Sequence, residues 1–403
     1  MIDCADADDE EAMHAITLSE NPMDIAFKNE NGTEFACALI TGTVEIWKLR
    51  EEEEEEASEG RERKGNKNKG KYEKKSTIRA HSESVRAIAF AKTGSILLTG
   101  SGDKSVLVID CETERAIGRI ANAHDQAITR MTKLKTDENV ICTGCDEGVL
   151  KIWDVRQERC AKSFKDDEIF VDFVSEIYHD TNAGERNELC VTSGDGTVAT
   201  IDLSAMKVIG QSDNMEDELL SCCVMKNGTK VVTGSQGGNL NIFNHGKERE
   251  PSDRFQGHPS SVDAMLKVSE DIVLTGSSDG LIRVITISPN QMLGLVGEHG
   301  EYPIERMSLS DDLNTLASAS HDHTVKIWDV SFLREENEKN NMMMMDTNNR
   351  NNNDDDDDDD SDSEQEKTRK KHKKGKAKNK VPTGKELQNA AKKKQAQKFF
   401  EGL

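Results

Sequence analysis

Short apolar runs, separated by polar turns, recur along most of the chain. In one example Ile96-Leu97-Leu98 leads into a Gly/Asp/Ser cluster, and residues 106–109 are again all apolar. Two such runs around a tight turn are typical of antiparallel strands. Another predicted strand, 85–90, precedes this pair, and residues 116–120 follow it. The pattern therefore predicts units of four short strands.

The turn segment between two such runs recurs at regular intervals. Six copies align without a gap and begin 44, 48, 42, 42 and 43 residues apart, and a weaker seventh copy precedes them. Units of about 40 to 45 residues with four strands each are typical of propeller blades. The copies occupy residues 99–110, 143–154, 191–202, 233–244, 275–286, 318–329 and, for the weak copy, 40–49. We therefore predict an all-β, seven-bladed propeller over residues 12–333.

Two charged segments fall outside this pattern. Residues 51–76 begin with six consecutive Glu and continue mainly in Lys, Arg, Glu and Gly, and residues 334–380 hold an acidic block followed by a basic one. Neither segment can bury enough apolar surface to offset the entropy of ordering its backbone, so both are predicted to be disordered. Residues 1–11 are an acidic extension, and residues 381–403 are predicted to form a short amphipathic segment.

The composition narrows the class of protein. A net charge of −23 argues against tight, nonspecific nucleic-acid binding by the whole molecule, because an acidic surface repels phosphate. The nine Cys are an odd number spread through predicted strands, which fits reduced thiols in the cytosol or nucleus. The amino terminus lacks the features of a secretory signal, and no apolar run approaches 18 residues. We therefore expect a protein that is neither exported nor membrane-spanning.

Trp-Asp dipeptides close two of the repeats. They are Trp153-Asp154 and Trp328-Asp329, and Gly257-His258 opens another repeat. With these dipeptides at the repeat spacing, the chain resembles the WD-repeat family. The resemblance implies a seven-bladed WD-repeat propeller in which residues 14–20 supply the outermost strand of the last blade.

The resemblance also implies a hydrogen-bond network within each blade, formed by a His, a Ser or Thr, an Asp in the tight turn, and the Trp. Some blades keep only part of it, because Ile109 and Ile285 stand where the Trp is expected. The matching residues are His299, Ser318, Asp322 and Trp328 in the last blade, His81 with Asp103, His258 with Asp279, and Trp153 with Asp154.

Catalytic and metal-binding readings of these residues have structural alternatives. His, Ser and Asp also compose a nucleophilic triad, but a recurring set that ties a turn to its neighbouring strand explains the same residues, so we expect no enzyme. Cys142 and Cys145 form a CxxC that overlies the repeated strand-to-turn step, and no second CxxC is present. Residues 234–238 are rich in Gly but lack the Lys of a phosphate loop. We expect neither a metal nor a cofactor.

The segment Trp153-Asp154-Val155-Arg156 resembles the short box by which some WD-repeat proteins dock onto a cullin-ligase adaptor. Trp153, Asp154 and Arg156 would then be docking residues, and the chain would be a substrate receptor of a ubiquitin ligase. An Arg at this position is also common as a surface or strand-end residue, so both readings stay open.

The C-terminal segment carries candidate address signals. Ser361 and Ser363 lie in an acidic context that acidophilic kinases prefer, and phosphate there would add charge without a change of fold. A plain solvated spacer is the alternative. The basic run that follows predicts a nuclear or nucleolar import signal, with weak RNA contact or mutual neutralisation with the acidic block as alternatives. Its leading cations are Lys367, Arg369, Lys370, Lys371, Lys373 and Lys374.

The order of these features is similar to one branch of the family. An acidic propeller, an acidic block, a Lys-rich block and a terminal Phe399-Phe400-x-x-Leu403 resemble the WD repeat-containing protein fifty-five subfamily, which is implicated in nucleolar ribosomal-RNA maturation. The resemblance implies a monomeric, non-catalytic scaffold for ribosome assembly factors. We expect it in the nucleus and nucleolus, with the cytoplasm as a second location, and away from membranes.

Overall fold

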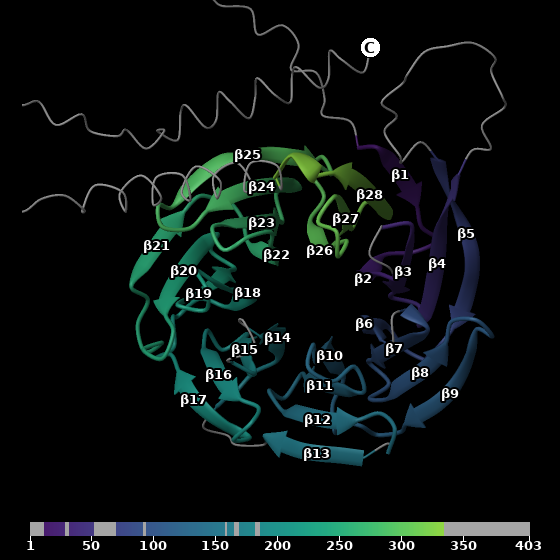
Figure 1. Ribbon diagram of the computed structural model, residues 1–403, viewed down its shortest axis with the longest axis horizontal. Coiled ribbons are helices and arrows are strands. Elements are labelled where there is room, and N and C mark those ends of the chain that lie inside the picture. The colour runs from purple at the N-terminus through teal and green to yellow at the C-terminus, as the bar shows by residue number, and fades with distance from the viewer. Residues whose placement is uncertain are drawn as a thin grey trace, which may run out of the picture. The chain divides into compact units, whose positions relative to one another are not determined.

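Seven four-stranded antiparallel sheets form a ring in the computed structural model of the chain, which confirms the predicted seven-bladed propeller (Figure 1). The structure describes residues 12–28, 32–51, 70–91, 94–157, 159–164, 169–181 and 186–333. The ring lies within one unit, Met1–Ser331, and of a second unit, Phe332–Leu403, only the first two residues are described. None of the described helical residues belongs to a helix long and apolar enough to cross a bilayer.

Each blade takes four strands in order from the central channel to the rim, except that the last blade receives its outer strand from the N-terminal end of the chain. From blade 1 to blade 7 the strands are β2 (Pro22–Phe27), β3 (Glu34–Leu39), β4 (Thr43–Glu51) and β5 (Gly70–Arg79); β6 (Val85–Ala91), β7 (Ile96–Ser101), β8 (Val106–Asp110) and β9 (Arg115–Ile120); β10 (Ile128–Lys133), β11 (Val140–Cys145), β12 (Leu150–Asp154) and β13 (Arg159–Phe164); β14 (Val174–Asp180), β15 (Glu188–Ser193), β16 (Val198–Asp202) and β17 (Lys207–Gln211); β18 (Leu219–Met225), β19 (Lys230–Ser235), β20 (Asn239–Asn244) and β21 (Asp253–Gln256); β22 (Val262–Lys267), β23 (Ile272–Ser277), β24 (Leu281–Thr286) and β25 (Gln291–Glu298); and β26 (Ile304–Leu309), β27 (Thr315–Ser320), β28 (Thr324–Asp329) and β1 (His14–Thr17).

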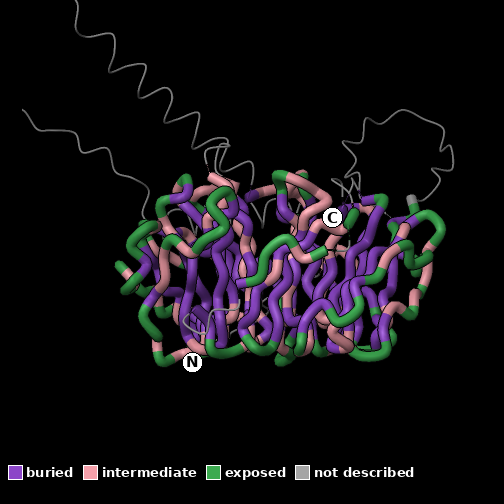
Figure 2. The backbone as a smooth tube through the Cα atoms, turned by 90° about the horizontal axis from the view of Figure 1, so that it is seen from below, coloured by how far each residue is buried: buried purple, intermediate pink, exposed green. Residues whose placement is uncertain are grey.

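The second strand of each blade is the most deeply buried. Every residue of β3, β7, β23 and β27 is buried, whereas the outer strands β9 and β13 are mostly exposed. Buried residues follow the strands, and exposed residues gather in the loops at the two ends of the ring (Figure 2). A strand that packs on neighbouring blades through both faces carries apolar side chains at successive positions. This explains why these strands appear in the sequence as continuous apolar runs.

Asp side chains fix the tight turn between the second and third strands of several blades. Asp195 accepts a hydrogen bond from the backbone N–H of Thr197 at 2.9 Å, and Asp322 accepts one from Thr324 at 2.8 Å. Side chains of this type stabilise a turn two residues ahead of themselves. At Gly280 the backbone has a φ of 78°, and an added Cβ would lie 2.1 Å from a carbonyl oxygen of the facing loop. Only Gly fits that position without strain.

The N-terminal strand closes the ring. β1 pairs antiparallel with β28, in a register that runs from His14 opposite Ile327 to Thr17 opposite Thr324. Ile16 is 6% exposed and packs in the core that blades 1 and 7 share. The predicted closure by residues 14–20 is therefore borne out, although the strand itself ends at Thr17.

The boundary of the charged insert differs from the prediction. The predicted disordered range was 51–76, whereas β4 extends to Glu51 and β5 begins at Gly70, with Leu49 opposite Tyr72. Tyr72 is the only apolar residue in the Lys-rich part of the insert, and it is buried against Phe35, with a ring-to-ring distance of 5.4 Å. Burial of this one aromatic side chain anchors β5, a strand whose many charged residues made it look disordered in the sequence. Residues 52–69 lie outside the described part of the chain.

Replacing Ile16 by Ala tests the closure. The substitution removes buried methyl groups from the joint between the first and last blades, so we expect a loss of about 2–5 kcal/mol in the free energy of unfolding, measured by denaturant titration. Thr17→Ala, at an exposed position of the same strand, should change it by no more than about 0.5 kcal/mol. Equal effects of the two substitutions would contradict the role of β1.

Candidate functional site

The last blade contains a complete chain of four hydrogen-bonded side chains. His299 precedes β26, Ser318 lies on β27, Asp322 in the following turn, and Trp328 on β28. The Nδ1 atom of His299 lies 2.9 Å from Asp322 Oδ2, and its Nε2 atom lies 2.7 Å from Ser318 Oγ. The indole N–H of Trp328 donates to the same Ser318 oxygen at 2.8 Å. The structure thus brings together all four residues that the sequence singled out in this blade.

The geometry of this chain favours a structural role over nucleophilic catalysis. Ser318 is completely buried and His299 is 2% exposed, so a substrate has no access to the hydroxyl. Burial raises the pKa of Asp322, but hydrogen bonds from His299 and Thr324 outweigh that effect and hold the pKa below its usual value. An ionised Asp, a His and a Ser linked in this way tie the outer loop, the turn and two strands together.

Blade 3 has the same chain without the acid. Trp153 Nε1 donates to Thr143 Oγ1 at 2.8 Å, and His124 Nε2 lies 2.7 Å from that oxygen. Glu147 occupies the turn position of the Asp but is hydrogen-bonded to Gln126, and the Nδ1 atom of His124 has no hydrogen-bond partner among the described residues. Burial, reinforced by the nearby Lys151 cation, lowers the pKa of His124 to about 3.

Blade 2 replaces the Trp but keeps the rest of the network. His81 Nδ1 lies 3.1 Å from Asp103 Oδ2, and His81 Nε2 lies 2.7 Å from Thr99 Oγ1. Burial raises the pKa of Asp103, but hydrogen bonds from Ser105 and the adjacent His81 bring it down to about 2. Ile109, which stands in place of the Trp, is buried in the core instead.

Blade 6 departs from the expected pairing. The sequence suggested His258 with Asp279, but Arg283 Nη2 lies 2.5 Å from Asp279 Oδ2 and takes this carboxylate. His258 keeps only its contact with Thr275, at 2.8 Å, and its Nδ1 atom has no hydrogen-bond partner among the described residues. A guanidinium binds a carboxylate with two parallel hydrogen bonds and so displaces the single donor of a neutral imidazole. Burial lowers the pKa of His258 to about 4.

Sequence reasoning expected a Ser or Thr in each network but named only Ser318, and so left out three threonines. Thr99, Thr143 and Thr275 each bind the blade's His and are completely buried. Each is the first residue of the repeated turn segment. The recurrence of Thr at this first position was the sequence signal that could have identified them.

The adaptor-docking candidate is only partly accessible. Trp153 is 5% exposed, because its ring packs in the core of the ring of blades. Arg156 has a side chain that is 54% exposed, and its Nε and Nη2 atoms donate to the two oxygens of Asp154 at 2.8 and 2.7 Å. Arg156 and Asp154 therefore form an ion pair at the end of β12, with Asp137 3.6 Å from the same guanidinium, and the planar cation is exposed to solvent.

The two cysteines of the CxxC segment pack as core residues. Cys142 and Cys145 lie on β11, both are buried, and burial raises the pKa of each thiol. No group of three or more His, Cys, Asp or Glu side chains suited to a metal ion occurs among the residues that the structure describes.

Charged side chains from the inner strands meet in the central channel. Arg306 on β26 reaches Glu176 on β14, with 3.2 Å between Nη1 and Oε2, although the two strands belong to blades 7 and 4. Enclosure in the channel raises the pKa of Asp24 to about 6 and that of Glu176 to about 7, while the positive charge of Arg130 acts in the opposite direction. The channel is therefore crossed by an ion pair rather than lined as an apolar ligand site.

One end of the ring is strongly acidic. We call it the turn face; it consists of the loops that precede each inner strand and the turns between second and third strands. Its described residues include fifteen carboxylates, one Lys and no Arg. The carboxylates are Glu20, Glu83, Asp103, Asp125, Asp146, Glu147, Asp172, Asp195, Asp213, Glu216, Asp217, Glu218, Asp279, Glu301 and Asp322. The loops at the opposite end mix cations with carboxylates. The turn face repels phosphate.

The remaining predicted residues lie outside the described part of the chain. They are the phosphorylation candidates Ser361 and Ser363 and the import candidates Lys367, Arg369, Lys370, Lys371, Lys373 and Lys374.

The buried histidines generate a testable pH dependence. A folded-state pKa of about 3 for His124, below the unfolded value of about 6.5, means that stability from its neutral form is complete above pH 6.5 and is lost as the pH falls toward 3. Between pH 7.5 and pH 5 this loss is about 2 kcal/mol. We therefore expect His124→Gln to reduce the measured fall in unfolding free energy over that range by about this amount.

The comparison is made between variants because other groups act with the opposite sign. Asp24 and Glu176 have raised pKa values, so their stabilisation is present at low pH and is lost as the pH rises through about 6 to 7. His321→Gln is the control, because its hydrogen bond to Glu305 raises the pKa of His321 and its removal should steepen the fall. An unchanged slope in His124→Gln would contradict the assignment.

Comparison with known proteins identifies relatives of the same architecture. The family model described as WDR55 matches residues 13–333. WD repeat-containing protein 55 of Arabidopsis thaliana is 40% identical over 265 residues, which cover 66% of this chain and 72% of that protein. WD repeat-containing protein JIP5 of Malassezia globosa is 33% identical over 352 residues, which cover 80% of this chain and 82% of the relative. WD repeat-containing protein 55 of Rattus norvegicus is 35% identical over 254 residues, 63% of this chain and 64% of the relative.

The matched range contains every blade, the closing strand β1 and the four-residue network of blade 7. Repeat, fold and family match therefore agree on one assignment: the chain belongs to the WDR55 family of WD-repeat propellers.

Proposed function

We propose that the chain is a protein-interaction scaffold that acts in nucleolar ribosome biogenesis and ribosomal-RNA processing. WD-repeat propellers are non-catalytic and generally bind other proteins, and this chain fits that description. The observation that carries the proposal is the placement of the blade polar groups. The side chains of His299, Ser318 and Asp322 are hydrogen-bonded to one another inside blade 7. The loops at both ends of the ring are exposed (Figure 2). Such a ring offers surfaces to partners rather than an enclosed reaction site.

The charge distribution supports different roles for the ring and for the C-terminal basic run. The turn face repels phosphate, so the propeller is suited to protein partners rather than to direct contact with an RNA backbone. The basic run that begins at Lys367 is suited to the two tasks that the ring is not, namely nuclear import and weak RNA contact. Resemblance to the nucleolar subfamily supports ribosome assembly factors as the partners.

Neutralising the basic run tests the location. In the full-length chain, Gln at Lys367, Arg369, Lys370, Lys371, Lys373 and Lys374 should abolish nucleolar accumulation of a fluorescent fusion, because import receptors and nucleolar RNA both bind clustered cations. Gln at Lys392, Lys393 and Lys394 is the control and should leave the nucleolar signal largely in place. Nucleolar accumulation of the first variant at the wild-type level would contradict the proposal.

The exposed Arg156 favours a second candidate function, the substrate receptor of a cullin-type ubiquitin ligase. Asp154 holds the guanidinium in a fixed orientation at the end of β12, which lowers the entropic cost of docking onto a partner. In this reading the adaptor binds the Arg156 end of the ring, and the client occupies the other end.

Arg156→Ala separates the two functions. Under the ligase reading, the amount of adaptor that co-purifies with the chain should fall at least about tenfold, as for a central interface Arg. Under the scaffold reading, assembly factors should co-purify unchanged, and stability should change by less than about 1 kcal/mol because the pair with Asp154 is exposed. Arg115→Ala, on the outer strand of blade 2, is the matched control.

A further inference from the structure

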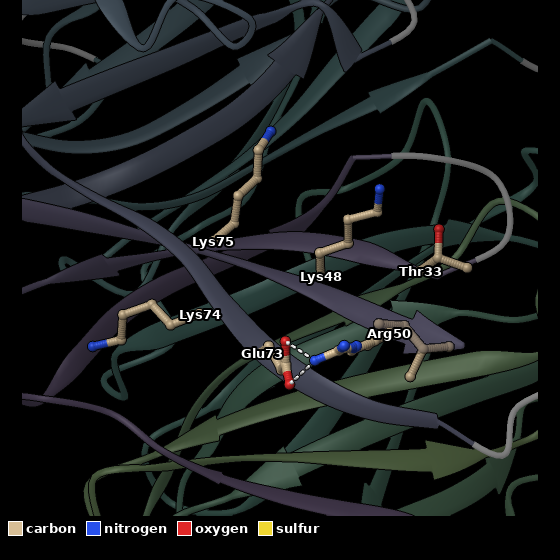
Figure 3. Close-up of a pocket in the computed structure, with 7 residues that line it drawn as sticks. Thr33, Lys48, Arg50, Glu73, Lys74 and Lys75 are labelled. Atoms are coloured by element: carbon tan, nitrogen blue, oxygen red, sulfur yellow. Dashed lines mark hydrogen bonds and ion pairs between the residues drawn. The ribbon is translucent and has the colours of Figure 1, made fainter. Parts of the chain in front are cut away.

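Blade 1 carries a basic groove in an otherwise acidic ring. The groove has a volume of about 580 Å³ and lies along the paired arms of β4 and β5 (Figure 3). It is lined by Thr33, Lys48, Leu49, Arg50, Glu73, Lys74 and Lys75, so that four of its seven residues are cations and one is an acid. A groove of this composition attracts a negatively charged ligand.

The acids around the groove neutralise only part of this charge. Glu45 lies 2.6 Å from the Nζ atom of Lys74, Glu34 lies 3.3 Å from that of Lys75, and Glu73 lies 3.2 Å from Arg50 Nη1. Glu34 is shared, because Lys28 also binds it, at 3.0 Å. The exposed Lys48 has no ion-pair partner among the described residues. The groove therefore keeps excess positive charge at the mouth.

Protection of a sheet edge explains some of these cations but not all of them. β5 is the outer strand of blade 1, and Lys residues on outer strands hinder edge-to-edge association. Lys48 and Arg50, however, lie on β4, which is paired on both sides. Their placement beside Lys75 and Glu73 builds a concave surface, which edge protection does not require (Figure 3).

The C-terminal end of the ring lies next to this groove. β28 pairs with β1, and the ring of His14 in β1 lies 5.5 Å from that of Tyr72 in β5. β28 and β4 are both third strands of neighbouring blades, so Asp329 and Glu51 end at the same end of the ring. The chain therefore leaves the propeller beside the arms that form the groove.

The chain that continues from this point contains a segment of opposite charge. Residues 354–366 hold ten carboxylates and no cation. Residues 334–353 separate this stretch from the last described residue, Leu333. A connection of that length spans up to about 70 Å when extended, which exceeds the width of a blade. Tethering of this kind gives a ligand an effective concentration in the millimolar range.

We propose that the basic groove of blade 1 is the docking site of the chain's own acidic stretch, residues 354–366. The acidic ring repels both this stretch and RNA, but the tether holds the stretch near the groove at a millimolar effective concentration, whereas RNA must bind from solution. Intramolecular docking therefore favours the acidic stretch. Docking occupies the acidic block and so leaves the following basic run, 367–380, free of it. Phosphorylation of Ser361 or Ser363 adds about 1.5 to 2 negative charges at each site and strengthens the contact.

Carbodiimide cross-linking of the full-length chain tests the proposal. The reagent couples carboxylates to lysine amines in direct contact, and trypsin releases the acidic stretch as one peptide between Arg350 and Lys367. In an equal mixture of ordinary and ¹⁵N-labelled chain, mass spectrometry separates links within one chain from links between two. We expect intramolecular links from this peptide to Lys48 and Lys75, and their loss in about 1 M salt, where the screening length falls to about 3 Å.

Charge reversal in the groove supplies the matched comparison. Lys48→Glu with Arg50→Glu should lower the yield of links at the retained Lys75 at least about fivefold. Arg115→Glu with Lys207→Glu, exposed cations on the outer strands of blades 2 and 4, should leave the yield unchanged. Equal melting temperatures of the two variants would show that both are folded.

Four outcomes would overturn the proposal. They are the absence of links, links only between copies, links from residues 51–56 in place of the acidic stretch, and an unchanged yield in the groove variant. A groove variant that binds an RNA oligonucleotide more weakly by fluorescence anisotropy, with its cross-links unchanged, would assign the groove to nucleic acid instead.

Discussion

The pairing of β1 with β28 is the constraint on which the rest of the structure depends. Every blade is stabilised by packing on two neighbours, and without β1 the last blade would lose its outer strand and leave β28 as the edge of a three-stranded sheet. Closure also decides which distant residues become neighbours. It brings His14 against Tyr72 in the first blade, and it delivers the C-terminal end of the ring beside the basic groove of that blade. One four-residue strand thus links stability to the surface on which the tail is proposed to dock.

The blade networks are uneven, and their unevenness has a physical basis. Blade 7, which is completed from two ends of the chain, has the full set of His299, Ser318, Asp322 and Trp328. In blades 3 and 6 the imidazole keeps one partner and loses the other, so protonation of His124 or His258 finds no compensating acid and becomes unfavourable. A partly satisfied network costs stability in a low-dielectric interior, and the remaining Thr contacts limit that cost.

Much of the fold could be predicted from the sequence, because the repeat multiplies a weak local signal by seven. The turn segments fixed the blade count, and the apolar runs marked strands such as β7. The prediction failed where a single side chain decides the outcome. Tyr72 anchors β5 within a Lys-rich stretch, and Arg283 takes Asp279 from His258, because pairing across a strand cannot be read from residue type alone. The ion pair between Arg306 and Glu176 joins residues 130 positions apart and leaves no sequence pattern. The basic groove could not be predicted either, because its cations lie on β4 and β5, which are separated in the sequence by the insert.

The central claim is that this ring is a binding scaffold for ribosome assembly rather than an enzyme. Gradient sedimentation of a nuclear extract, with the endogenous chain followed by immunoblot, tests that claim most directly. The account predicts that a substantial fraction of the chain sediments with pre-ribosomal particles at moderate salt and moves to the light fractions when the particles are dissociated. A chain found only in the light fractions, or together with a ligase adaptor, would contradict it.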